Sequence, residues 1–70
     1  DFLVMDESGR YLAIDIKPGE SVNSADFRHI RWFQELEDEE RCIGIILYAG
    51  CEVRSFGHRC YAVPLACLWL

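Results

Sequence analysis

The stretch that decides the fold lies at residues 11–17 and reads Tyr-Leu-Ala-Ile-Asp-Ile-Lys, followed at once by Pro18 and Gly19. Residues 2–5, Phe-Leu-Val-Met, form a second apolar run. Side chains alternate between the two faces of a strand, and both runs are mostly apolar on both faces. Such strands are typical of a central position in an α/β sheet, so we predict a hairpin whose strands are covered on both sides.

The loop of this hairpin has two alternative lengths, which place Asp1 differently relative to Asp15. A two-residue loop, Ser8-Gly9, sets the two aspartates on opposite faces of the sheet. A three-residue loop that adds Glu7, with Gly9 in the left-handed conformation, sets Asp1 directly opposite Asp15. We favour the longer loop, because two-residue hairpin loops prefer Asn-Gly or Asp-Gly.

A helix is predicted to begin at a cap formed by Asn23 or Ser24 and to run to about Glu37, with Asp26 in its first turn. Apolar residues recur at the helical period and are expected to pack on the sheet; they are Phe27, Ile30, Phe33 and Leu36, and Trp32 widens the stripe. His29 and Gln34 are expected to face solvent.

Three further elements follow this helix. Residues 42–49 are short, apolar and rich in β-branched side chains, which predicts a buried strand joined to residues 11–17 by a right-handed parallel crossover. Residues 52–56 and 60–63 predict a second hairpin of edge strands around Gly57-His58-Arg59. Pro64 then fits the first turn of a short helix at residues 65–70, whose apolar sequence implies docking.

The predicted fold is therefore α/β: a mixed sheet of four or five strands, one long helix packed on it and a short C-terminal helix. Part of one sheet face should be bare, and we expect self-association through that uncovered face. Seventy residues make a single domain over residues 1–70. No initiator Met precedes Asp1, and we expect the chain to be a fragment of a larger protein.

Composition restricts the compartment and the partners. The sequence carries no signal-peptide pattern and no apolar stretch near the roughly 20 residues of a membrane helix, which predicts a cytoplasmic protein without a membrane partner. The four cysteines form no Cys-x-x-Cys pair and are predicted to be buried free thiols. A zinc site of Cys51, His58 and Cys60 is the alternative, although its spacing matches no common structural site.

The formal net charge of −5 is concentrated in the acidic segment at residues 35–40. Acids at a helix C-terminus oppose the macrodipole, so this segment should end the helix near Glu37; an acidic partner-binding patch is the alternative interpretation. The charge argues against an extensive nucleic-acid surface. Arg28 and Arg31 are the candidates for contact with a phosphate backbone.

Asp1, Asp15 and Lys17 are the candidate catalytic residues. Two converging carboxylates, Asp1 and Asp15, can hold Mg²⁺ and leave coordination positions for water and a phosphate oxygen. The metal would lower the pKa of a bound water, and Lys17 could orient the nucleophile or stabilise developing negative charge. Two metal-binding carboxylates beside a lysine are suited to phosphodiester cleavage.

The order of elements resembles the core of the PD-(D/E)xK nuclease superfamily, also called the restriction-endonuclease-like fold. A closer resemblance covers almost the whole chain: it is similar to the uncharacterised C-terminal domain of a family of predicted AAA-type bacterial and archaeal ATPases. The segments that carry this resemblance are Asp1-Phe2-Leu3-Val4, Ala13-Ile14-Asp15-Ile16-Lys17, Ser24-Ala25-Asp26-Phe27-Arg28, Gly44-Ile45-Ile46-Leu47-Tyr48 and Ala62-Val63-Pro64-Leu65.

The resemblance implies that Asp1 is the first motif acid, Asp15 the second and Lys17 the motif lysine, in a truncated restriction-endonuclease-like core. It further implies that an ATPase domain precedes this domain and is its partner. The residues before Asp1 and the first helix of the superfamily are missing, so we expect the fragment alone to be catalytically inactive.

Two functions follow from these residues and this resemblance. The first is a nuclease-like accessory domain of an ATPase, with a site that depends on a divalent metal, acts on nucleic acid and has either kept or lost its activity. The alternative is a non-catalytic regulatory or protein-docking domain of the ATPase, in which the two aspartates are polar strand ends.

Overall fold

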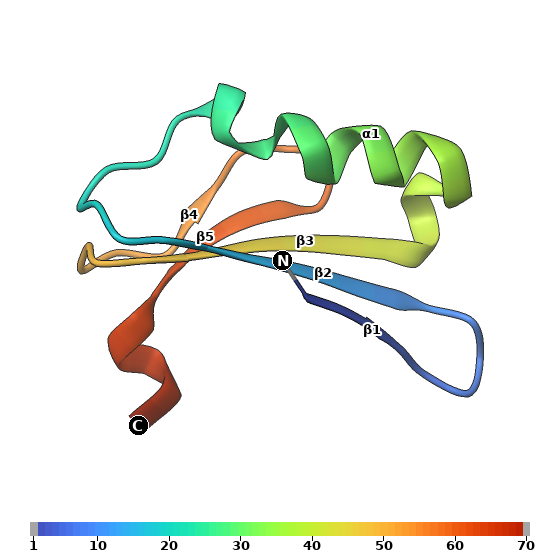
Figure 1. The fold of residues 1–70 in the computed structure, drawn as a ribbon, viewed down its shortest axis with the longest axis horizontal. Coiled ribbons are helices and arrows are strands. Elements are labelled where there is room, and N and C mark those ends of the chain that lie inside the picture. The colour runs from blue at the N-terminus through green and yellow to red at the C-terminus, as the bar shows by residue number, and fades with distance from the viewer. Residues whose placement is uncertain (1, 70) are drawn as a thin grey trace.

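A computed structural model describes residues 2–69, which form one mixed five-stranded sheet with a helical segment on one face (Figure 1). The strand order is β1-β2-β3-β5-β4. The strands are β1 (Phe2–Met5), β2 (Tyr11–Lys17), β3 (Cys42–Tyr48), β4 (Arg54–Ser55) and β5 (Cys60–Pro64). The helical elements are η1 (Ser24–Phe27), α1 (Arg28–Glu37), η2 (Glu39–Arg41) and η3 (Leu65–Trp69). The predicted α/β fold with a mixed sheet is confirmed.

The first hairpin has the register of the three-residue loop. Phe2 pairs with Ile14 and Met5 with Tyr11, and the Asp6 N–H donates to the Arg10 carbonyl across the loop at 2.9 Å. Gly9 has φ +86°, a left-handed conformation that costs glycine little because it has no Cβ. The prediction of the longer loop is therefore confirmed for residues 2–5, whereas Asp1 lies outside the described residues.

The link from β2 to β3 is a crossover through the helical segment, and β2 and β3 are parallel, as predicted. The segment begins after Asn23, whose backbone N–H donates to the Asp26 carboxylate at 2.9 Å, and it ends at Glu37. Asp38 then caps η2 by accepting the N–H of Glu40 at 3.0 Å. The end of α1 at the acidic segment is thus confirmed.

The core lies between α1 and the middle of the sheet. Alternate residues of β3 and β5 face the helix and are buried, namely Cys42, Ile46, Tyr48, Cys60 and Ala62. At Gly44 the helix comes so close that a Cβ would lie 2.4 Å from Cγ2 of Ile30. Only glycine fits there, so this close approach requires the glycine and fixes α1 over β3.

The second hairpin forms around Gly57, His58 and Arg59, all three with positive φ. β4 is an edge strand as expected. β5, however, lies between β3 and β4 and is parallel to β3, so the prediction of two edge strands is wrong for β5. Its small, buried Cys60 and Ala62 fit an inner position better than an edge.

Two predictions about burial are also wrong. β1 is an edge strand, and all four of its residues are exposed, because α1 lies over β3 rather than over β1. η3 turns below the sheet in Figure 1 and leaves Leu68 and Trp69 largely exposed, so it does not dock as predicted.

The sheet face opposite α1 is only partly covered. Apolar side chains on this face are exposed on four strands, namely Phe2, Val4, Ile16, Ile43 and Tyr61. The predicted bare face is therefore present among the described residues. Self-association through it stays a prediction.

Candidate functional site

Lys17, at the end of β2, is held by an ion pair. Its Nζ lies 2.7 Å from Oδ2 of Asp26, and both side chains are about one-third exposed or less. The same Oδ2 accepts the Asn23 N–H, so one carboxylate oxygen joins β2 to the start of the helical segment. The hydrogen bonds from Lys17 and then from Asn23 lower the pKa of Asp26 below its ordinary value.

Asp15 lies two residues before Lys17 and projects from the same, helix-bearing face of β2. Its Oδ1 accepts the N–H of the next residue, Ile16, at 2.8 Å. Among the ion pairs of residues 2–69 none involves Asp15, since the nearby Lys17 is taken by Asp26. Asp15 and Lys17 therefore share a face but do not pair with each other.

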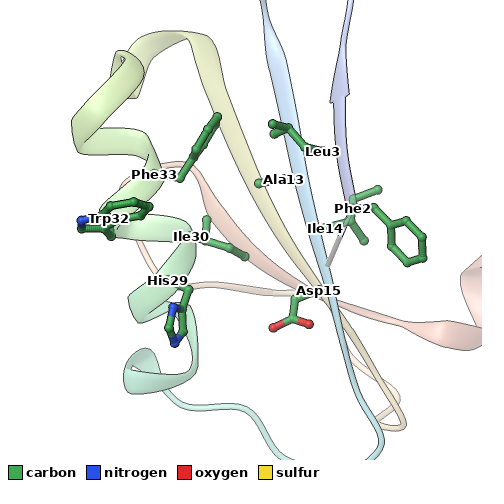
Figure 2. A pocket seen from close by; sticks show the side chains of 9 residues that line it. All are labelled: Phe2, Leu3, Ala13, Ile14, Asp15, His29, Ile30, Trp32 and Phe33. Carbon is green, nitrogen blue, oxygen red and sulfur yellow. The ribbon is translucent and has the colours of Figure 1, made fainter.

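Asp15 borders an apolar groove of about 280 Å³ between α1 and the first hairpin (Figure 2). In Figure 2 its carboxylate points from β2 towards the side of the groove on which His29 lies. The remaining lining is apolar and consists of Phe2, Leu3, Ala13, Ile14, Ile30, Trp32 and Phe33. This groove was not predicted from the sequence, because both apolar strands of the hairpin were expected to be covered.

The described residues do not supply a complete metal site. Residues 2–69 contain no group of three His, Cys, Asp or Glu side chains placed to share an ion. Asp1, the second predicted ligand beside Asp15, lies outside the described residues. The alternative zinc site finds no support either, because Cys51 is exposed, whereas Cys60 is buried under α1.

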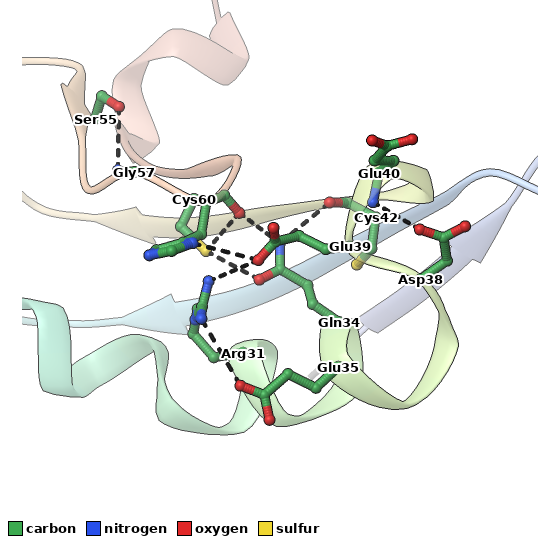
Figure 3. Close-up of polar contacts among 11 residues, drawn as sticks. Arg31, Gln34, Glu35, Asp38, Glu39, Glu40, Cys42, Ser55, Gly57 and Cys60 are labelled. Carbon is green, nitrogen blue, oxygen red and sulfur yellow. Dashed lines mark hydrogen bonds and ion pairs between the residues drawn. The ribbon is translucent and has the colours of Figure 1, made fainter.

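Of the two candidate phosphate contacts, Arg28 is exposed, whereas Arg31 is engaged in ion pairs. Nη1 of Arg31 lies 2.9 Å from Oε1 of Glu39, and Nη2 lies 3.8 Å from Oε1 of Glu35 (Figure 3). Nδ1 of His58 lies 3.3 Å from the same Glu39 oxygen. Part of the acidic segment is thus neutralised within the chain, and Arg31 is not presented freely to a phosphate.

Gln34 is fully buried, so the prediction that it faces solvent is wrong. Its Nε2 donates to the carbonyls of Cys42 at 3.1 Å and His58 at 2.8 Å, and its Oε1 accepts from Sγ of Cys60 at 3.6 Å (Figure 3). Burial raises the pKa of the Cys42 and Cys60 thiols, which keeps both protonated. This cluster fixes α1 to β3 and to the turn before β5.

A sequence signal for Gln34 did exist. It lies four residues after Ile30 and seven after Phe27, which is the spacing of one helix face, and both of those residues are buried. Leu36 belongs to another face and is 62% exposed. The predicted stripe was therefore correct at its start and wrong at Leu36, because a glutamine occupies the buried position.

The prediction of His29 as a solvent-facing helical residue is confirmed. Residues 2–69 include no helix that is long and apolar enough to cross a membrane.

The fold and the site define a small mixed α/β domain with an ion-paired lysine, an open apolar groove and an aspartate that forms no ion pair within residues 2–69. The chain belongs to the DUF4143 family of domains of unknown function, whose model matches residues 1–68. The resemblance to an uncharacterised domain is confirmed to that extent. No curated protein and no solved structure matches the chain.

Proposed function

We propose that this chain is a non-catalytic docking or regulatory domain with a nuclease-like arrangement of strands, accessory to an ATPase. The observation that carries the proposal is the Lys17–Asp26 ion pair at 2.7 Å. A catalytic lysine must reach the reacting phosphate or its nucleophile. Here the Lys17 ammonium is instead bound to the carboxylate that also accepts the N–H of Asn23 at the start of the helical segment.

A further feature supports the proposal. Large apolar side chains are exposed on both sides of the sheet, among them Leu3, Met5 and Ile16, which is typical of surfaces that bind other proteins. This exposed apolar surface favours binding to a partner.

A second candidate function is a divalent-metal phosphodiesterase acting on nucleic acid. It is favoured by one observation: Asp15 and Lys17 project from one face of β2, next to a hairpin with the longer-loop register. In this candidate Asp1 and Asp15 would hold Mg²⁺, which would supply an acidic metal-bound water. Lys17 would then have to leave Asp26.

One experiment separates the two candidates: titration of the ¹⁵N-labelled chain with Mg²⁺ and with Mn²⁺, followed by NMR. For a docking domain we expect no joint change at Asp15 and Lys17 at millimolar metal. Joint shifts of these two residues that disappear in Asp15→Ala would contradict the docking proposal and support the phosphodiesterase. Glu20→Ala, an exposed acid outside the groove, is the matched control.

A further inference from the structure

The helix-bearing face of the sheet is covered by α1 on one half only. α1 packs on β3 through Ile30 and Gly44 and contacts Tyr11 of β2 through Phe33, whereas no helix of residues 2–69 lies over β1. A helix is about 10 Å wide and strands are about 4.8 Å apart, so one helix covers roughly two strands. The uncovered strip beside α1 therefore has the width of one more helix.

We call this strip the β1–α1 trough. Its outer wall is Leu3 on β1, and Met5 continues that wall on the same face of the strand. Its floor is Ala13 on β2, and its inner wall is His29, Trp32 and Phe33 on α1. These inner-wall residues are spaced i, i+3 and i+4, so they lie on neighbouring turns of one side of the helix.

The trough is apolar and exposed. Leu3, Met5 and Trp32 are between 54% and 62% accessible, although each is a large apolar side chain. The groove at its centre, about 280 Å³, has room for a few large apolar side chains. The exposed apolar strip extends beyond that groove along β1 to Met5, which suits an elongated partner better than a small molecule.

A negative charge at one end of the trough indicates that the partner carries a positive charge there. The Asp15 carboxylate points into this end, and no Lys, Arg or His of residues 2–69 forms an ion pair with it. Among residues 2–69, the other titratable side chain that lines the groove is His29. A cationic side chain of the partner could donate a charge-assisted hydrogen bond to the Asp15 carboxylate.

We propose that the β1–α1 trough binds an amphipathic helix of a partner protein, which inserts apolar side chains beside Trp32 and places a Lys or Arg on Asp15. The inference rests on the proposed docking function and names its partner class. The bound helix would lie alongside α1 on the sheet, and its anchors would follow the i, i+3, i+4, i+7 spacing.

The test uses two synthetic helical peptides and the ¹⁵N-labelled chain in EDTA. One peptide carries leucines at i, i+3, i+4 and i+7 with a lysine one turn beyond, and its match carries glutamine instead of that lysine. We expect the lysine peptide to shift the signals of Leu3, Ala13 and Phe33 and to bind about tenfold more tightly than its match. In Asp15→Asn this preference should disappear.

Two surface variants complete the test. Trp32→Glu should abolish binding of both peptides without changing Tm, because Trp32 is 62% exposed. Val53→Glu, at a position that is 63% exposed and outside the trough, should bind as the unchanged chain does. Absence of shifts in the trough, or a lysine preference that persists in Asp15→Asn, would overturn the inference. So would trough signals that shift with protein concentration alone, since a second copy would then be the occupant.

The two proposals can fail separately. Peptide binding in EDTA together with a joint Mg²⁺ response of Asp15 and Lys17 would overturn the non-catalytic assignment and leave the trough as a docking site. If Mg²⁺ causes no NMR shifts and neither peptide binds, the trough inference is overturned. The proposed docking function would then belong to another surface, such as the bare sheet face.

Discussion

The two halves of the helix-bearing sheet face have similarly apolar strands but opposite surroundings. Over β3 and β5, small residues such as Gly44, Cys60 and Ala62 let α1 approach closely, and Gln34 links the layers. Over β1, the large side chains of Leu3 and Met5 are exposed, although the neighbouring Ala13 of β2 is buried. The first half is buried and contributes stability, whereas the second half exposes apolar surface, to which we have assigned a docking role as a proposal.

The difference comes from residue size rather than hydrophobicity. A helix packs closely on a sheet where the sheet residues below it have small side chains. Here Ile30 of α1 packs directly on Gly44 of β3. Once α1 is fixed over β3, no other helix of residues 2–69 lies over β1. Three substitutions test how much the covered half and the contacts at the start of the helical segment contribute to stability.

The largest effect is expected from Gln34→Ala in the covered half. It removes a fully buried side chain that donates to two carbonyls and accepts from Cys60, so it leaves a cavity and unpaired polar groups. We expect a loss of about 3 kcal/mol in the free energy of unfolding, measured by urea denaturation. Glu35→Ala, the exposed next residue, should change it by less than about 0.5 kcal/mol. Equal losses in the two variants would refute the role given to Gln34.

A smaller effect is expected from Gly44→Ala. The new Cβ would meet the Ile30 side chain at 2.4 Å and the Cys60 sulfur at 3.3 Å, and α1 must move away from β3. We expect a loss of about 2 kcal/mol and a lower Tm in thermal unfolding followed by circular dichroism. Gly19→Ala is the matched control, since its Cβ would meet only Cε of Lys17 at 4.0 Å. An unchanged Tm for Gly44→Ala would mean that α1 does not pack closely on β3, which would contradict the proposed difference in packing between the two halves.

The smallest effect is expected from Asp26→Asn, which removes the ion pair joining β2 to the helical segment. We expect a loss of about 1 kcal/mol at pH 7. The pKa of Asp26 is lowered in the folded chain, so its contribution is complete well above the ordinary value of 3.8 and is lost as the pH falls below that value. The gap between Asp26→Asn and the unchanged chain should therefore close in acid.

Urea denaturation between pH 7 and pH 2.5 checks this pH dependence. Glu20→Gln, an exposed acid outside the pair, should show no gap at any pH. A gap for Asp26→Asn that stays constant down to pH 2.5 would contradict the assigned ion pair, because the loss would then not depend on the Asp26 charge.

Local pattern was enough for most elements of this chain. The hairpin loop length followed from Ser8 and Gly9, the crossover from the order of strand, helix and strand, and the end of α1 from the acids after Leu36. Each of these features depends on neighbours in sequence: φ at one glycine, the handedness of a connection and the charge near a helix end.

Burial was harder to predict because it depends on which strand lies beside which. The sequence pattern of β1 predicted a central strand, but β1 is an edge strand. The pattern of β5 predicted an edge strand, but β5 lies between β3 and β4. Gln34 was placed in solvent although the spacing from Phe27 and Ile30 indicated the core. In each case the residue type suggested one environment and the position in the sheet imposed another.

The sequence by itself determined the strands, the helical segment, the hairpin loop and the shared face of Asp15 and Lys17, because these follow from local geometry. Only the tertiary structure decided that Lys17 is bound by Asp26, that Asp15 is left without an ion pair among the described residues, and that a trough opens beside α1. Those features need residues distant in sequence to meet, and the close approach of α1 to Gly44 determines where they do.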